Sequence, residues 1–374
     1  MSLVLNDEQR MLRDSVQSFL DGRAPVAHLR ELRDSNGLVG FSRELWGDFA
    51  DQGYSAVLVP EAQGGLGLGI VEAGLISERL GHTLTPSPFL STAVLAAWVI
   101  SHGGSKVQQE RLLPLIAAAE TVVGVAVDEH SKHRPDAIAT RARRDGDRFV
   151  LDGEKIFVVD GHVADTLIVV ARTGQESLGL FLVESKAEGV TIERTRMVDA
   201  HNAARVRLSG VAVPADAVLG AADGGAALLE PLLDVGRVIV AAQLLGIADE
   251  VFGRTVAYLK ERRQFGRPIG EFQALQHRAA QLYCDIELAR AIVLKALRAV
   301  QADPAEARVL ASQAKARACT TANRAVQEGV QMHGGVGMTD ELDIGLFMKR
   351  ARVLQELFGD AGFHAARVAT LGGY

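Results

Sequence analysis

The stretch DGDRFVLDGEK, residues 145–155, is the part of the chain that decides the fold class. Asp-Gly pairs stand on both sides of its apolar centre, and such pairs supply the positive φ angles that tight hairpin turns need. Around it, the runs TVVGVAV at 121–127 and TLIVV at 166–170 are rich in β-branched residues. The pattern predicts antiparallel hairpins between residue 121 and about residue 219, and therefore a small β-barrel or sandwich.

Helical patterns lie on both sides of this strand region. From Asn6, which can cap a helix, apolar residues recur at helical spacing to about residue 120, and the same spacing returns from about residue 225. Further on, Asp303-Pro304 is typical of a helix start, and the last helix is expected over about 340–358. This order of elements argues against a doubly wound βαβ fold.

We therefore predict a mainly α protein with a central β-domain, in three parts. They are an N-terminal helical domain over residues 1–120, a middle β-barrel over 121–222, and a C-terminal four-helix bundle over 223–374 that makes the oligomer interface.

The bulk composition argues against several classes of function. The formal net charge is −6 and no run of Lys or Arg occurs, so no nucleic-acid partner is expected. Cys284 and Cys319 give neither a disulfide framework nor a metal-ligand spacing, and His130 and His133 are interpreted as part of a solvated polar loop, so no metal site is expected. We expect no secretory signal, no segment apolar enough to cross a membrane, and a cytoplasmic location.

The stretch ERRQFGRPIGEFQ, residues 261–273, places arginines and an aromatic ring beside a glycine turn at the end of a helix. Arginine holds phosphate oxygens with a planar fork, and Phe265 offers a face for stacking, so the cluster suits a diphosphate and a flat ring. The alternative is a solvated basic helix end that the helix dipole favours. From these residues alone, both interpretations stay open.

A second stretch, QMHGGVGMTDE at residues 331–341, runs from the end of one helix through glycines into the start of another. Glycines allow a ligand to approach the backbone closely. Thr339 or Asp340 is expected to cap the following helix, whose free amides attract anions. Taken alone, a corner between two helices is the commoner explanation of such a stretch.

Together, the two stretches resemble the acyl-CoA dehydrogenase family, and the resemblance covers essentially the whole chain. It implies the cofactor FAD, an acyl-CoA substrate and an electron-transfer flavoprotein as electron acceptor. In that family both segments reach across a dimer interface to FAD bound mainly by the neighbouring subunit. By this resemblance, the residues that contact the partner's FAD are Arg262, Gln264, Phe265, Gln331, Gly334 and Gly335.

The family reaction needs a carboxylate that takes the α-proton of the thioester while the β-hydrogen leaves as hydride. At the two positions where family members carry this glutamate, the chain has Phe358 and Gly236, which cannot accept a proton. Arg237 resembles an arginine near the acyl-CoA channel, and it either assists substrate binding or stabilises the bundle. The candidates for a relocated base are Asp234, Glu230, Glu356 and Asp360. The last two also have plain interpretations, because Glu356 is expected to point elsewhere and Asp360 to form a turn or to contact the cofactor.

The β-region departs from the family pattern as well. Residues 128–136 (DEHSKHRPD) replace the threonine–glutamate–proline stretch that touches the flavin ring, and residues 157–161 (FVVDG) lack the tryptophan of the strand that covers it. The segments that serve a chain's own flavin have therefore changed, while those that serve the neighbour's flavin remain.

This asymmetry suggests a subunit of a mixed bacterial acyl-CoA dehydrogenase tetramer, in which a catalytic partner supplies the base and the ring-binding loops. Two alternatives stay open. One is a self-sufficient homotetrameric dehydrogenase with a relocated base, and the other is a structural partner subunit without a substrate site.

Overall fold

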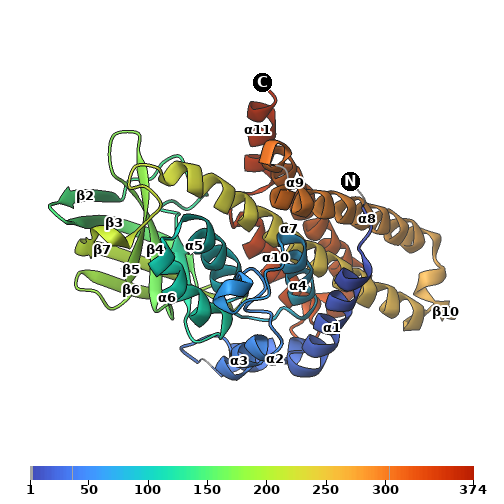
Figure 1. The fold of residues 1–374 in the computed structure, drawn as a ribbon. Coiled ribbons are helices and arrows are strands. Elements are labelled where there is room, and N and C mark those ends of the chain that lie inside the picture. The colour runs from blue at the N-terminus through green and yellow to red at the C-terminus, as the bar shows by residue number, and fades with distance from the viewer. Residues whose placement is uncertain (1–2, 36, 303) are drawn as a thin grey trace. The chain divides into compact units, whose positions relative to one another are not determined.

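The structure, a computed structural model, describes residues 3–35, 37–302 and 304–374. Its elements follow the order helices, strands, helices along the chain (Figure 1). The fold class predicted from the sequence, mainly α with a central β-domain, is therefore confirmed.

Two compact units make up the structure, and the N-terminal helices contribute to both. One unit holds the residues up to Arg30 together with Gly74–Thr85 and Arg237–Tyr374. The other holds Glu31–Ala73 and Pro86–Gly236. We call the first the bundle unit and the second the β-unit.

The first part of the chain forms helices with clear local signals. Asn6 caps α1 as predicted, because its side chain accepts a hydrogen bond from the backbone N–H of Gln9 while the Gln9 side chain accepts one from the N–H of Asn6. Val16 and Leu20 on the apolar face of α1 are fully buried. The helices are α1 Asp7–Arg23, α2 Val26–Asp34, α3 Arg43–Asp51, α4 Ile70–Thr83, α5 Ala97–Gly103 and α6 Lys106–Ala117, with a π-helix at Phe89–Ala96.

The middle of the chain forms one eight-stranded sheet in the β-unit, in the order β6-β7-β3-β2-β4-β5-β8, with β1 paired in parallel to β4. Alternate residues of β3, such as Phe149 and Leu151, point to the buried side, as the two-residue period predicts. The strands are β1 Val123–Ala126, β2 Arg141–Asp145, β3 Arg148–Val159, β4 Thr166–Arg172, β5 Leu178–Glu184, β6 Val190–Arg196, β7 Asn202–Pro214 and β8 Val218–Leu219.

Only one of the two Asp-Gly pairs forms the predicted hairpin turn. Asp145 pairs with Arg148 across the β2–β3 turn, where Gly146 has φ +65°. The second pair lies inside β3, where the pairing with β7 shifts register between Leu151 and Gly153. A Cβ on Gly153 would lie 2.5 Å from Thr140 Oγ1, so this glycine serves a β-bulge and a close approach between strands, and the predicted second turn is wrong.

The C-terminal helices are α7 Gly225–Glu261, α8 Gln273–Ala302, α9 Pro304–His333, α10 Ile344–Glu356 and α11 Ala361–Leu371. The proposed cap of α9, Asp303, lies outside the described residues. The prediction of the last helix was wrong in three respects. Helix α10 begins at Ile344, its cap position is Asp343 and neither Thr339 nor Asp340, and the chain continues into α11. Asp360 starts α11 by accepting a hydrogen bond from the N–H of Phe363 at 2.9 Å.

Helix α7 is long and apolar enough to cross a membrane by composition, so the expectation that no segment meets this test was wrong. Of its most apolar window, 94% is buried inside the protein. Such burial is typical of a core helix, which is hydrophobic on all sides because it is surrounded by other elements.

Candidate functional site

The first predicted binding stretch forms a small exposed hairpin in the bundle unit. Strands β9 Arg263–Gln264 and β10 Arg267–Pro268 are joined by Phe265 and Gly266, whose φ angles are +54° and +80°. Two positive φ angles in a two-residue loop define a tight turn of type I′. Phe265 at its tip is 92% exposed, and its ring meets Phe272 edge-on, with 6.0 Å between centroids.

The second predicted stretch forms an open corner after α9. Gly334 has φ +67°, and a Cβ built on Gly334 or Gly335 would meet no atom within 4 Å. Gln331 and both glycines are exposed. The backbone of this corner is therefore accessible to a ligand over its glycine positions.

The structure brings together the helix ends from which the two stretches emerge. The ring of Tyr258, near the end of α7, lies 4.5 Å from the ring of His333 at the end of α9. Tyr258 O accepts a hydrogen bond from the N–H of Arg262, and His333 Nδ1 is 2.7 Å from Gly329 O. The ends of both helices are thus fixed to each other. We call the surface formed by Arg262, Gln264, Phe265, Gln331, Gly334 and Gly335 the nucleotide shelf.

The groups of the nucleotide shelf are chemically compatible with the adenosine diphosphate part of FAD. It offers exposed arginine, a free aromatic face and glycine backbone without Cβ atoms in the way, which are the groups that diphosphate and adenine require. Its members lie open on the surface of this chain, so they can cover only one side of a dinucleotide.

The positions of the expected base carry no proton acceptor, and their neighbours are engaged elsewhere. Phe358 is buried with φ +59°, and Asp360 caps α11. Glu356 forms an ion pair with Arg352 on the same helix at 2.6 Å. The structure thus gives Glu356 and Asp360 local roles within the bundle unit.

A buried lysine that sequence reasoning missed holds this turn. Lys315 of α9 is fully buried, and its Nζ donates to Gly359 O at 2.8 Å and to Gln355 O at 3.2 Å. Burial lowers the pKa of the Lys315 amine. The lysine therefore acts on the carbonyls at the end of α10, around Phe358.

The remaining candidates lie on α7. Asp234 is 3% exposed, Glu230 is half-buried, and Gly236 is part of the helix interior. Arg237 is fully buried with its guanidinium 5.8 Å from the centre of the Phe363 ring. The contact with Phe363, and not burial itself, favours the interpretation of Arg237 as a residue that stabilises the bundle.

In the β-unit, the loop that departs from the family pattern is held by a hydrogen bond and an ion pair of its own. Asp128 accepts from His133 Nδ1 at 2.8 Å, and the buried Lys155 donates to Glu129 at 2.7 Å. Burial lowers the pKa of Lys155 to about 8 despite the attraction of Glu129. Burial also acts to raise the pKa of Glu129, but the charge of Lys155 and the hydrogen bonds to the carboxylate outweigh it, so that this pKa lies below its ordinary value.

The two histidines of this loop differ. His130 is exposed as expected, but His133 is buried against Asp128, so its assignment to a solvated loop was wrong. Further along, Phe157 is 41% exposed with φ +52°, and Asp160 accepts a hydrogen bond from the buried Ser91 Oγ at 2.6 Å.

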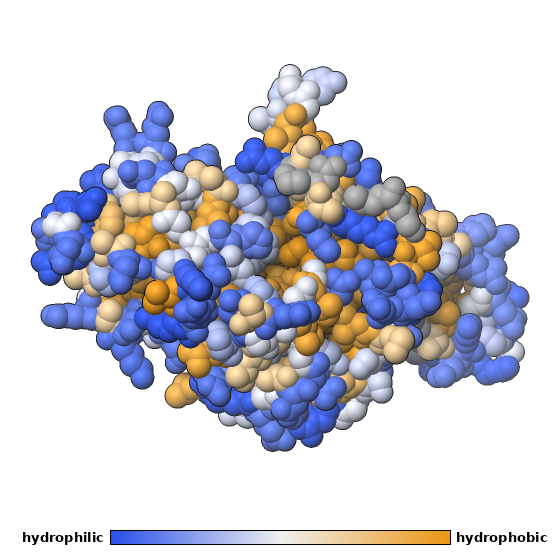
Figure 2. Space-filling view, viewed as in Figure 1, coloured by the Kyte–Doolittle hydropathy of each residue, from blue (hydrophilic) through white to orange (hydrophobic). Residues whose placement is uncertain are grey.

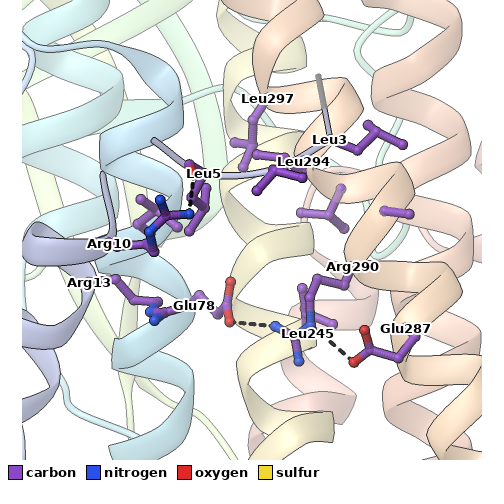
Figure 3. A pocket seen from close by; sticks show the side chains of 14 residues that line it. Leu3, Leu5, Arg10, Arg13, Glu78, Leu245, Glu287, Arg290, Leu294 and Leu297 are labelled. Atoms are coloured by element: carbon purple, nitrogen blue, oxygen red, sulfur yellow. Dashed lines mark hydrogen bonds and ion pairs between the residues drawn. The ribbon is translucent and has the colours of Figure 1, made fainter. Parts of the chain in front are cut away.

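The bundle unit also contains a pocket of about 310 Å³, lined by α1, α4, α7, α8 and the segment before α1 (Figure 3). Figure 2 shows hydrophobic residues among the charged ones on this face of the molecule. At the pocket, Arg290 contacts Glu78 at 2.9 Å and Glu287 at 3.3 Å, while Arg10 pairs with Asp7. The third arginine of the lining, Arg13, pairs with Asp14 at 2.9 Å. All three arginines therefore have carboxylate partners, and the pocket offers no evident site for an anionic group.

A cluster of Glu78, His82 and Asp249 lies beside this pocket, with potential metal-ligand atoms within 4.8 Å of one another. Glu78 is held by Arg79 at 2.6 Å and by Arg290, which also holds Asp249 at 2.8 Å. Arg79 beside Glu78, and Arg290 beside both carboxylates, disfavour a bound cation, so this cluster is a partly buried ion-pair network.

Comparison with known proteins identifies the class to which this fold and this shelf belong. The acyl-CoA dehydrogenase N-terminal, middle and C-terminal domains match residues 6–120, 119–211 and 223–371. The chain is 34% identical over 350 residues to the acyl-CoA dehydrogenase IpdE2 of Mycobacterium tuberculosis, covering 92% of this chain and 91% of that protein.

Solved structures agree with this match. The ChsE4–ChsE5 complex from Mycobacterium tuberculosis has a TM-score of 0.91 at 27% identity, covering 100% of this chain and 99% of that chain. A variant of the Tcur3481–Tcur3483 steroid ACAD has a TM-score of 0.90 at 30% identity, with 98% of both chains covered. The chain belongs to the acyl-CoA dehydrogenase family. It is an oxidoreductase of this family, whose cofactor is FAD.

Proposed function

We propose that this chain is one of two different subunits of an acyl-CoA dehydrogenase, in which it completes the FAD site of a catalytic partner. FAD accepts the hydride that leaves the β-carbon of the acyl-CoA thioester. The task of this chain is to bind and orient the nucleotide end of that cofactor through its shelf. Electron-transfer flavoprotein as acceptor and a cytoplasmic location belong to the same proposal.

The observation that carries the proposal is the contrast between two regions of the chain. The nucleotide shelf is open, with Phe265 exposed at the tip of a hairpin. The loop that follows β1 has its carboxylates engaged by His133 and Lys155, and Phe358 stands where the family carries a base. A chain that supplies half of a partner's FAD site needs the nucleotide shelf. It does not need a base or flavin-ring contacts of its own.

The roles of the shelf residues follow from their side chains. Arg262 is exposed and makes no ion pair with another described residue, so its planar fork is available for the diphosphate. Phe265 offers its face to a flat ring, and Gln264 and Gln331 offer amide donors and acceptors. The glycines let the dinucleotide approach the backbone.

The names of two relatives support a mixed assembly. Both the ChsE4–ChsE5 complex and the Tcur3481–Tcur3483 steroid ACAD are named as pairs of different chains. A self-sufficient homotetramer with a relocated base has less support, because Glu356 is paired with Arg352 and Asp360 caps a helix.

The test compares the chain purified alone with the chain co-expressed with a family member that carries a glutamate base. We expect the single chain to be colourless and the complex to contain FAD. The double variant Arg262→Gln/Phe265→Ala should weaken FAD retention by the complex at least about tenfold. Arg143→Gln, an exposed arginine of β2, is the matched control and should leave FAD retention unchanged.

Three results would contradict the proposal. A single chain that is yellow and loses its flavin colour with acyl-CoA thioesters is a self-sufficient dehydrogenase. A stable complex without FAD makes this chain a structural partner. Full FAD retention in the double variant places the cofactor away from the nucleotide shelf.

A further inference from the structure

The carboxylate of Asp343, between the glycine corner and α10, does not make the contact that is usual at its position. Asp343 stands at the residue before α10, where an aspartate commonly caps the helix, but its side chain makes no capping bond. Its Oδ1 instead accepts from Arg30 Nε at 3.0 Å and from Arg30 Nη2 at 2.9 Å, while its Oδ2 accepts from Arg254 Nη1 at 2.8 Å. Both oxygens are thus taken by arginines from other helices.

Arg30 of α2 reaches two points on the same segment. Besides Asp343, it contacts Asp340 Oδ2 through Nη1 at 3.2 Å. The side chains of Arg30 and Asp343 are 23% and 24% exposed, so this contact is partly screened from water. A planar guanidinium that binds two carboxylates fixes their separation and orientation more firmly than a single ion pair does.

Arg254 of α7 supports Asp343 from the other side. Its Nε donates to Glu250 at 2.6 Å, and its guanidinium lies 5.3 Å from the centre of the Phe347 ring on α10. Asp343 is therefore held between α2 and α7, both through groups with further partners of their own.

The corner itself is short and rich in glycine. Between His333 and Asp343 lies a 3-10 turn over Gly334–Met338, followed by Thr339, which bonds back to Val336 O through its N–H and its Oγ1. Glycine-rich backbone loses more conformational entropy on ordering than other backbone does. Fixing the far end of the corner in advance lowers the entropic cost of binding a ligand on it.

We propose that Arg30, through Asp340 and Asp343, is a positioning residue for the glycine corner of the nucleotide shelf. It rests on the proposed function, since the ligand of that corner is the adenosine diphosphate part of FAD. In this proposal Arg30 acts on the backbone of the corner through Asp340 and Asp343, and not on the cofactor directly. The first helical segment of the chain thereby helps to determine how tightly the complex retains FAD.

The test uses Arg30→Gln, Arg30→Lys and a control in the full complex with the catalytic partner. Lysine keeps the charge but cannot bind two carboxylates with one planar group, so partial rescue is expected. The control is Arg33→Gln, because Arg33 lies one turn later on α2 and pairs with its neighbour Asp34. Flavin absorbance after dilution measures FAD retention, and hydrogen exchange of residues 334–343 in the single chain measures the order of the corner.

For Arg30→Gln we expect about tenfold weaker FAD retention and faster exchange over 334–343, with Arg30→Lys between this variant and the wild type. Unchanged exchange would overturn the structural part of the inference, and faster exchange with unchanged FAD retention would overturn its link to the cofactor. Failure of the proposed function looks different. In that case Arg262→Gln/Phe265→Ala also retains all FAD, while the exchange result still reports on Arg30.

Discussion

The substitution Lys155→Met removes a charge from the inside of the β-unit. It tests what holds the loop after β1, whose sequence differs from the family pattern. Lys155 has a fully buried side chain, and its Nζ donates to Val127 O at 3.0 Å and to Glu129 Oε1 at 2.7 Å. Methionine has a similar length but no donor, so the variant leaves the Glu129 carboxylate without its counter-charge.

The size of the effect follows from what Glu129 keeps. Removing one partner of a buried ion pair costs about 3–5 kcal/mol. Glu129 still accepts from the N–H groups of Ala139 at 2.6 Å and Thr140 at 3.0 Å, which partly compensate its charge. We therefore expect a loss near the lower limit, about 3 kcal/mol in the free energy of local unfolding.

Hydrogen exchange of the β3 and β4 amides is a suitable assay, because it reports on the β-unit alone in a protein with two units. A loss of about 3 kcal/mol corresponds to roughly hundredfold faster exchange. The double variant Lys155→Met/Glu129→Gln removes both charges and should recover about 2 kcal/mol of the loss. The reasoning is refuted if the double variant exchanges as fast as Lys155→Met, since the unpaired carboxylate then is not the cause.

Two further predictions concern the bundle unit. Gly335→Leu adds a side chain into open space, so the melting temperature of the single chain should hardly change, while absorbance of the purified complex should show loss of FAD. Lys315→Met leaves the carbonyls of Gln355 and Gly359 without their donor and should cost about 2 kcal/mol at pH 7 in chemical unfolding. Because burial lowers the pKa of Lys315 in the folded state, the unfolded chain binds the proton more tightly, and the lysine's contribution to stability rises with pH up to about 10.5, the value of the unfolded chain. The difference between the wild type and Lys315→Met should therefore grow between pH 7 and pH 10, and a difference that shrinks would contradict this assignment.

Signals confined to one segment of sequence predicted the fold well. The Asn6 cap, the period of two in β3 and the hairpin at Gly146 depend on neighbours a few residues away, and the structure confirms each. Gly153 carries the same Asp-Gly signal but forms a bulge, because its conformation is set by the close approach of Thr140. Helix α11 was missed because Asp360 after a glycine is equally typical of a turn.

The candidate site also has one part that local sequence predicts and another part that it does not. The nucleotide shelf consists of two continuous stretches, so its residues could be proposed before their proximity was known. The groups that hold it are separated along the chain: Arg30 and Asp343 are 313 residues apart, and Lys315 contacts Gly359 across 44 residues. Nothing in the local pattern of one sequence indicates which distant carboxylate an arginine will meet.

Phe265 gives the last and most direct reason to expect a second chain. A phenylalanine at φ +54° has a strained backbone, and Asn-Gly is the pair that a type I′ turn prefers. Phe265 is 92% exposed, so within this chain its ring makes little packing contact that could offset the backbone strain. Phe265→Asn should therefore leave the single chain as stable as the wild type or raise its stability by about 0.5 kcal/mol, while FAD retention by the complex falls. Thermal unfolding of the single chain and flavin content of the complex measure the two effects. The substitution is expected to spare the stability of the single chain and to weaken FAD retention only if the ring makes its stabilising contact with another molecule. A variant that destabilises the single chain and leaves FAD retention unchanged would show that the ring stabilises the fold of its own chain.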